Sequence, residues 1–299
     1  MRKLRSAIIG CGKIAAVHAQ ALKNIELTEF VAVQSRTASK AEEFGTRFGV
    51  QPYTDIVTMI KREGIEVVVI CTPHPVHAAP AITAFQNGAH VLVEKPLAIT
   101  LQDCDAMISA AVSSKKKLGV VSQRRFYPPV ERMKKAIDDG KIGKPMLGQV
   151  VMYGWRDEAY YKSDPWRGSW EKEGGGVLVN QAPHQLDVLQ WLMGSEMAEL
   201  YGVWQNINHP YIEVEDTAVA IITFKSGAVA NILVSNAQKP GIYGKVHIHG
   251  SNGATMGVQT DGGAMFIAGR SNILEPPVND LWTIPGEENN LATYIKEDT

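Results

Sequence analysis

Val91-Leu92-Val93-Glu94-Lys95-Pro96 is an apolar run that stops abruptly at a charged pair and a proline. Such a run predicts a buried strand of a parallel sheet. Open α/β sheets bind their ligands at the carboxyl ends of their strands, which is where Lys95 would stand. We therefore predict that Lys95 transfers a proton at this edge. A solvent-exposed lysine at a strand end is the alternative, because lysine is rarely buried.

The length and composition are those of an ordinary globular protein with room for two domains. The chain has 299 residues, 45% hydrophobic and 20% charged, with a formal net charge of −1. This near-neutral balance gives no sign of a nucleic-acid partner or a membrane surface. Three widely spaced cysteines favour free thiols in a reducing compartment. The N-terminus enters a strand directly, without a signal peptide, so we expect a cytoplasmic protein.

A glycine-rich turn stands between a predicted strand, Leu4–Ile9, and a predicted helix. Its sequence, Gly10-Cys11-Gly12-Lys13-Ile14-Ala15, has the form GxGxxA. In this pattern Gly10 permits the tight turn and Gly12 lets the backbone approach a pyrophosphate, which the free amides of the helix start then attract. Strand, turn and helix together predict dinucleotide binding by residues 10–14. An ordinary strand-to-helix turn is the alternative.

The end of the second predicted strand, residues 30–33, bears on the choice of cofactor. An acidic residue near this point bonds the ribose hydroxyls of NAD, and none stands between Phe30 and Ser39. Ser35 and Arg36 are present instead, and a guanidinium beside a hydroxyl suits a 2′-phosphate. We therefore predict NADP as the preferred cofactor over NAD. If Arg36 only stacks on adenine, either cofactor would bind.

The buried strand predicted at residues 66–70 ends in Cys71-Thr72-Pro73-His74-Pro75-Val76-His77. The nicotinamide half of the cofactor should lie at this strand end. Our predicted cofactor contacts here are Cys71, Thr72, Pro73 and His77. The two histidines could suggest a metal, but such a site usually also draws on carboxylates or cysteines. Pro75 also leaves the pair in a loop and a helix start, so we predict no metal.

Three motifs in this order resemble those of the Gfo/Idh/MocA oxidoreductases, which are named for glucose–fructose oxidoreductase and inositol dehydrogenase. They are residues 10–15 with His18 behind them, residues 71–77, and Val93-Glu94-Lys95-Pro96-Leu97. The resemblance extends to about Gly250. It implies that Lys95 is catalytic, that Glu94 and Lys95 lie near the cofactor, and that the peptide before the proline is often cis.

The sequence predicts an α/β protein of two domains. Residues 1–122 would form a Rossmann domain, and residues 123–299 an α+β domain for substrate binding and oligomerisation. After Pro145, strand-like runs separated by glycine and asparagine turns predict an open, mainly antiparallel sheet; they are residues 147–154, 214–224, 228–234 and 245–250. The resemblance implies that such a sheet makes oligomer contacts, in a homodimer or homotetramer.

Two segments of the second half carry the candidate substrate residues. Residues 155–170 interleave aromatics with arginines, which suits a sugar, although a surface loop pinned by buried tryptophans is the alternative. Asn180 and His184 stand four apart and could share one helix face. The resemblance implies that many members of the family have aspartate at the position of Asn180. Asp187 either orients the imidazole of His184 or faces the sheet. The candidate substrate residues are Arg125, Tyr153, Trp166, Arg167, Asn180 and His184.

Together these features predict an NAD(P)-dependent oxidoreductase acting on a sugar, an inositol or a sugar derivative. Lys95 would be its acid/base, helped by His184 and by Asn180 as a hydroxyl-orienting amide. The alternatives are a catalytically silent nucleotide-binding regulator and an NAD-dependent hydrolase of the glycosidase type. The chain ends at Tyr294-Ile-Lys-Glu-Asp-Thr299, where the resemblance implies a long helix. We therefore expect a truncated or shortened relative.

Overall fold

The computed structural model describes residues 2–238, 242–260 and 277–287. Contacts divide the chain into two compact units. Unit 1 comprises Met1–Val121 and Lys172–Gly174, and unit 2 comprises Ser122–Glu171 and Gly175–Thr299. Among the described residues, no helix is long and apolar enough to cross a membrane. The expectation about a C-terminal helix concerns residues 288–299, which lie outside the described ranges.

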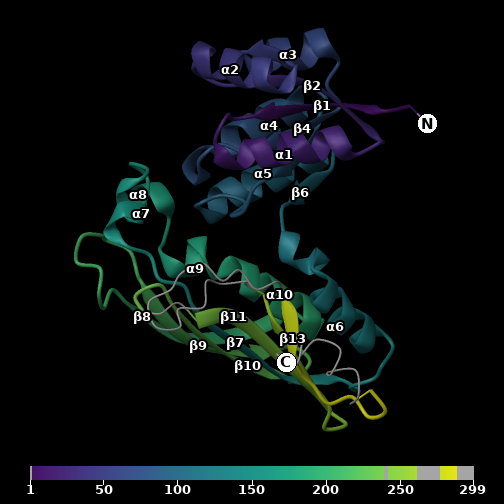
Figure 1. Ribbon diagram of the computed structural model, residues 1–299, viewed down its shortest axis with the longest axis vertical. Helices are drawn as coiled ribbons and strands as arrows, with labels where there is room; N and C mark the ends of the chain where they lie inside the picture. Colours follow the sequence, from purple (N-terminus) through teal and green to yellow (C-terminus); the bar gives the residue numbers. More distant parts are fainter. Residues whose placement is uncertain (1, 239–241, 261–276, 288–299) are drawn as a thin grey trace, which may run out of the picture. The chain divides into compact units, whose positions relative to one another are not determined.

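The described part of unit 1 forms a six-stranded parallel sheet in the order β3-β2-β1-β4-β5-β6. This is the strand order of a doubly wound dinucleotide-binding fold, as predicted. The carboxyl ends of β1, β4 and β5 therefore meet at one edge of the sheet. The strands are β1 (Leu4–Ile9), β2 (Thr28–Gln34), β3 (Gln51–Tyr53), β4 (Val67–Ile70), β5 (His90–Val93) and β6 (Leu118–Val120). Figure 1 labels β1, β2, β4 and β6 of this sheet.

Two helices of unit 1 begin at residues whose side chains cap them. Asp55 accepts a hydrogen bond from the N–H of Thr58 at 2.7 Å, and Thr100 accepts one from the N–H of Asp103 at 3.1 Å. These are side-chain caps at the helix starts. The helices of unit 1, of which Figure 1 labels α1 to α5, are α1 (Lys13–Asn24), α2 (Ala38–Phe48), α3 (Ile56–Glu63), η1 (His74–Val76), α4 (Ala78–Gln86) and α5 (Leu101–Ser113).

Across the described ranges, the strands of unit 2 form one seven-stranded sheet in the order β13-β12-β11-β7-β10-β9-β8. Only β7 and β10 pair in parallel, so the sheet is mainly antiparallel, as predicted. The sequence did not predict β8, β12 or β13. The strands are β7 (Pro145–Tyr153), β8 (Met197–Gln205), β9 (Thr217–Phe224), β10 (Val229–Ser235), β11 (Ile242–Gly250), β12 (Thr255–Gln259) and β13 (Val278–Trp282).

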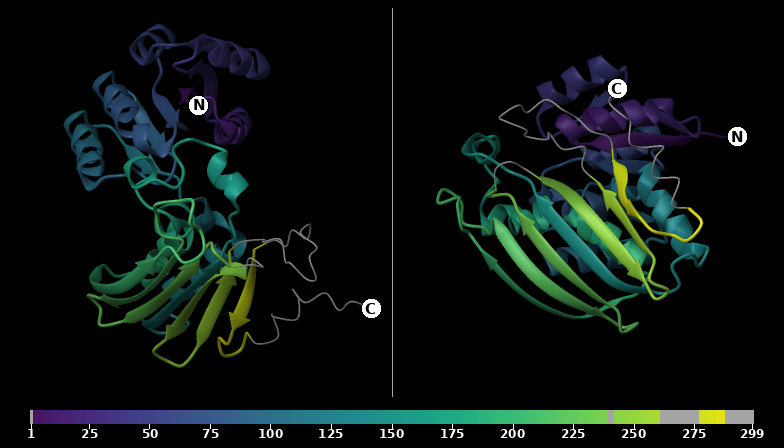
Figure 2. Two further views of the ribbon diagram at one scale, coloured as in Figure 1. Left: turned by 90° about the vertical axis from the view of Figure 1, so that its left-hand side faces the viewer. Right: turned by 60° about the horizontal axis from the view of Figure 1, so that its bottom comes forward.

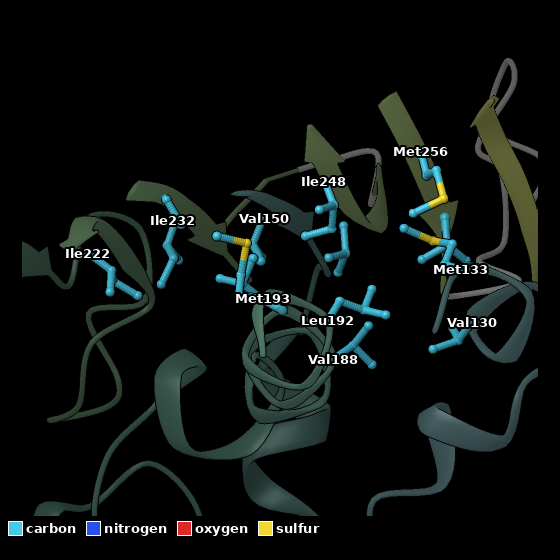
Figure 3. Close-up of a cluster of buried hydrophobic side chains, with 14 of the residues drawn as sticks. Val130, Met133, Val150, Val188, Leu192, Met193, Ile222, Ile232, Ile248 and Met256 are labelled. Carbon is cyan, nitrogen blue, oxygen red and sulfur yellow. The ribbon is translucent and has the colours of Figure 1, made fainter. Parts of the chain in front are cut away.

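Helices cover one face of this sheet, and none of the described helices lies over the other face, as both views of Figure 2 show. In Figure 3, Val188, Leu192 and Met193 of α10 point toward the strands, where Val150 and Ile248 lie. All five side chains are at most 3% exposed, so this layer is the core of unit 2. The described helices are η2 (Gln123–Phe126), α6 (Pro128–Asp138), α7 (Glu158–Lys162), α8 (Trp170–Glu173), α9 (Val177–Asn180) and α10 (Pro183–Met193).

Candidate active site

The glycine turn, residues 10–12, lies at the carboxyl end of β1 against the loop that follows β4. Gly10 has φ +101°, and a Cβ there would stand 2.8 Å from the carbonyl oxygen of Cys71. Only glycine fits this position. The N-cap of α1 is Gly12, which makes no side-chain cap hydrogen bond, and the first turn of α1 contains no acidic residue. Lys13 and Ile14 are exposed there. These features fit the pyrophosphate of a dinucleotide.

The end of β2 presents the two residues predicted to meet the ribose. Ser35 is partly buried, and its hydroxyl accepts a hydrogen bond from the N–H of Thr37 at 3.3 Å. Arg36 is exposed. Cys11 of the glycine turn lies next to Ser35. Burial raises the pKa of the Cys11 thiol above its ordinary value, and a hydrogen bond with Ser35 offsets part of this increase.

The lysine turn, Glu94-Lys95-Pro96, follows β5 directly, and its Lys95–Pro96 peptide is cis, as the resemblance implies. The N–H of Glu94 donates to the carbonyl of Ile70 at 3.0 Å, which extends the pairing of β4 with β5. One carboxylate oxygen of Glu94 accepts from the N–H of Lys95 at 3.2 Å. The other lies 2.7 Å from Nε2 of His18 in α1. Glu94 thus connects the lysine turn to the helix that follows the glycine turn.

The Thr72 loop, residues 71–77, follows β4. Burial and the charge of Glu94 raise the pKa of the Cys71 thiol, which makes it a poor nucleophile. His77 is fully buried, and its ring nitrogens lie 2.9 Å from the carbonyl oxygens of Thr72 and Pro96. The ring of His77 is thus held by two backbone carbonyl groups of unit 1. Of the residues predicted in this loop, Cys71 and His77 are buried, Thr72 is partly buried and Pro73 is exposed.

The two histidines of the Thr72 loop lie close together without forming part of a larger ligand set. The ring centroids of His74 and His77 are 5.9 Å apart, in an edge-on arrangement. Within the described ranges, no group of three or more His, Cys, Asp or Glu side chains could hold a metal ion.

In unit 2, Asn180 and His184 lie in two successive helices and not in one. Asn180 ends α9, whereas His184 is in the first turn of α10, which begins at Pro183. A continuous helix would need an N–H at Pro183 to reach the carbonyl of Val179, and proline has none. Asn180 is buried and donates from Nδ2 to the hydroxyl of Tyr160 at 3.0 Å, while His184 is partly buried.

The aromatic and arginine residues before α9 pack on one another. The Arg167 guanidinium lies over the rings of Tyr160 and Trp166, 4.2 Å and 4.3 Å from their centroids. Arg167 also donates to the Tyr160 hydroxyl and to Asp164. These side chains therefore form one packed cluster, which includes the Tyr160 hydroxyl that accepts the hydrogen bond from Asn180. Tyr153, the remaining predicted residue of this region, is partly buried at the end of β7.

Asp187 forms an ion pair with Arg125. Its two oxygens accept hydrogen bonds from Nε and a terminal nitrogen of Arg125, at 2.7 Å and 2.5 Å. This hydrogen bonding raises the pKa of Arg125. The guanidinium also lies 5.4 Å from the ring centroid of Trp191. Arg125 therefore fixes η2 to α10, the helix that carries His184. The ion pair with Asp187 uses much of the hydrogen-bonding capacity of the Arg125 guanidinium.

Sequence reasoning missed Glu215, which holds the start of α9. Glu215 is only 2% exposed. Its carboxylate accepts hydrogen bonds from the N–H groups of Gly176 and Leu178, at 2.8 Å and 3.0 Å. Its backbone carbonyl accepts from the N–H of Val177 at 3.0 Å. The available signal was a pair of adjacent acids, Glu215-Asp216, at the start of the predicted strand 214–224, because buried carboxylates require partners.

Comparisons with known proteins match both halves of the chain. Residues 4–122 match the family described as an oxidoreductase family with an NAD-binding Rossmann fold, and residues 130–256 match the GFO/IDH/MocA C-terminal domain. The chain is 29% identical to scyllo-inositol 2-dehydrogenase (NAD(+)) of Bacillus subtilis (strain 168), over 84% of this chain and 73% of that protein. It is 28% identical to myo-inositol 2-dehydrogenase of Thermotoga maritima (strain ATCC 43589 / DSM 3109 / JCM 10099 / NBRC 100826 / MSB8), over 84% and 74%.

The solved structures add a match at the level of three-dimensional fold. The WlbA dehydrogenase from Bordetella pertussis, in complex with NADH and UDP-GlcNAcA, matches with a TM-score of 0.79 and 31% identity. The match covers 86% of this chain and 73% of that one.

Proposed function

The chain belongs to the GFO/IDH/MocA oxidoreductases, and from that premise we propose that it transfers hydride between NAD(P) and a hydroxyl-bearing carbon of a sugar, inositol or sugar derivative. The observation that carries this proposal is the hydrogen bond between His18 and Glu94. It ties the helix after the glycine turn to the turn that presents Lys95. Cofactor binding and proton transfer thus share one edge of the sheet in unit 1.

In this proposal the bound nicotinamide accepts or donates the hydride. During oxidation, the nitrogen of Lys95 takes the proton of the substrate hydroxyl while the carbon loses its hydride, so that a carbonyl forms. During reduction, Lys95 returns the proton to the carbonyl oxygen. His184 assists this transfer, and Asn180 orients the substrate hydroxyl because an amide can hydrogen-bond but cannot accept a proton.

The substrate class is inferred from the relatives and from the cluster in unit 2. Two relatives are named inositol dehydrogenases, and the WlbA structure contains UDP-GlcNAcA. The packed rings of Trp166 and Tyr160 beside the Arg167 guanidinium suit a sugar ring and its hydroxyl or carboxylate groups. Binding titrations of NADPH and NADH, followed by absorbance assays with sugars, inositols and sugar acids, test the proposal. Failure to bind either cofactor would refute it.

We propose NADP as the preferred cofactor, on the basis of Ser35 and Arg36 at the end of β2. Arg36→Ala should raise the dissociation constant of NADPH by about 10- to 100-fold and leave that of NADH nearly unchanged, because only NADPH offers a 2′-phosphate to the guanidinium. Fluorescence titration measures both constants. Arg47→Ala, which removes a cation from the last turn of α2, is the control. Equal weakening of both cofactors would mean that Arg36 stacks on adenine.

We also propose that a second copy of the chain covers the open face of the unit 2 sheet. Tyr201 and Val203 of β8 pair with Ile221 and Val219 of β9, and the four side chains are 74%, 54%, 57% and 44% exposed. An exposed apolar patch of this kind usually marks an interaction surface.

Ile221→Glu should convert the oligomer to a monomer, because a carboxylate would be buried without a partner in the interface. Light scattering coupled to size-exclusion chromatography measures the mass. The control is Ser226→Glu, which adds the same charge in the turn between β9 and β10. A wild-type monomer, or an Ile221→Glu variant of unchanged oligomeric mass, would contradict this assembly.

A catalytically silent regulator is a second candidate, because Asn180 stands where an acid is expected. This reading predicts tight binding of NADPH or NADH, but no hydride transfer to any member of the substrate panel. Turnover of a single panel member, with one carbonyl product formed for each cofactor reduced, would eliminate it.

A further inference from the structure

His77, one of the predicted cofactor contacts, has an imidazole ring that is buried in unit 1. It precedes α4 at the N-cap position but makes no side-chain cap hydrogen bond to that helix. Its ring instead spans two loops, with Nε2 at 2.9 Å from the carbonyl oxygen of Thr72 and Nδ1 at 2.9 Å from that of Pro96. The residue is 0% exposed, so water does not compete for these contacts.

These two loops follow neighbouring strands. β4 and β5 are paired up to Ile70 and Val93, and the N–H of Glu94 adds one more bond to the carbonyl of Ile70. Beyond that point the imidazole of His77 links the two strands' extensions. The ring therefore connects the two loops at the edge of the sheet where Lys95 lies.

Each loop contacts a different part of the proposed site. The Thr72 loop lies against the glycine turn, since a Cβ on Gly10 would stand 3.0 Å from the backbone nitrogen of Thr72. The carbonyl of Pro96, on the other side, belongs to the residue directly after Lys95. A single buried ring thus connects the turn assigned to the cofactor with the turn assigned to proton transfer.

We propose that His77 is a positioning residue for Lys95, acting through its Nδ1 contact with the Pro96 carbonyl. The proposal rests on the catalytic role of Lys95 proposed above. A displacement of about 1 Å in a reacting group can cost about 100-fold in rate. The contact with Thr72 holds the cofactor-side loop and should affect cofactor binding more than proton transfer.

Two conservative variants separate the contacts. The side-chain amide nitrogen of asparagine stands close to the position of Nδ1 of histidine, and that of glutamine close to Nε2. His77→Asn should therefore keep the bond to Pro96, and His77→Gln the bond to Thr72. We expect His77→Gln to lose about 100-fold in kcat and His77→Asn to stay within about tenfold of wild type. Each variant keeps one of the two contacts and loses the other, and their thermal midpoints are measured so that a loss of stability can be separated from a loss of kcat.

A second readout follows Lys95 without turnover. The rate at which trinitrobenzenesulfonate labels Lys95 is measured against pH by mass spectrometry, in the full-length protein with NADPH present and absent. His77→Gln should shift the midpoint of this profile, and His77→Asn should leave it close to that of wild type. A merely structural role predicts that kcat follows the thermal midpoint in both variants and that neither profile shifts.

The outcomes separate this inference from the proposed function. Equal losses of kcat in both variants, with unshifted labelling profiles, would overturn the positioning role and leave the oxidoreductase proposal standing. If the wild-type protein turned over no substrate, the proposed function would fail, and the labelling profiles alone would decide the role of His77. A shift of the Lys95 labelling midpoint in His77→Gln, without one in His77→Asn, would support the positioning role of His77.

Discussion

Lys95→Ala is expected to lower kcat by about 100- to 10,000-fold while the dissociation constant of NADPH changes little, because the variant removes the group that transfers the proton. Stopped-flow absorbance of the nicotinamide measures turnover, and fluorescence titration measures binding. The matched control is Lys61→Ala, which removes an exposed lysine from the last turn of α3 and should leave both quantities unchanged.

The pH profile of kcat identifies the reason for the loss. A lysine that accepts a proton near neutral pH must have a pKa well below about 10.4, the value for an unperturbed side chain. For oxidation, activity should therefore fall as the pH drops below that pKa, and this acidic limb should be missing in Lys95→Ala. Partial rescue of the variant by added primary amines would show that an amine is what it lacks. Unchanged turnover at saturating cofactor would refute the role of Lys95.

The Rossmann half could be predicted because its signals are local. A strand, the turn at residues 10–15 and a helix lie within about 20 residues of sequence, and each reports a backbone requirement, such as the φ of +101° at Gly10. The sheet of unit 2 was harder. Residues 198–205 of β8 are exposed throughout, so this strand lacks the alternation of buried and exposed side chains that identifies a half-buried strand.

The interactions that support the site could not be predicted, because their partners are distant in sequence. Glu215 bonds backbone groups 37 and 39 residues away, and Arg125 bonds Asp187 across 62 residues. No periodic pattern encodes either pair. The four-residue spacing of Asn180 and His184 favours a shared helix face, whereas Pro183 starts a new helix between them.

Gly176→Ala is expected to lower the free energy of unfolding of unit 2 by about 3 kcal/mol or more, since it combines overpacking with lost charge-assisted hydrogen bonds. A Cβ at Gly176 would lie 1.8 Å from the carbonyl oxygen of Glu215, which is backbone and cannot rotate away. Relief of the clash must separate α9 from Glu215, whose buried carboxylate would then lack its N–H partners.

Tryptophan fluorescence during urea unfolding measures this change in the right unit, because all six tryptophans lie after residue 154 and outside Lys172–Gly174. Gly154→Ala is the matched control: nothing lies within 4 Å of a Cβ there, and its φ is outside the left-handed region. It should change the free energy of unfolding by less than about 0.5 kcal/mol. If the two variants unfolded at the same urea concentration, the close approach of Glu215 would not constrain α9. A selective loss in Gly176→Ala, with lower kcat and unchanged NADPH binding, would show that the start of α9 determines how Asn180 is presented.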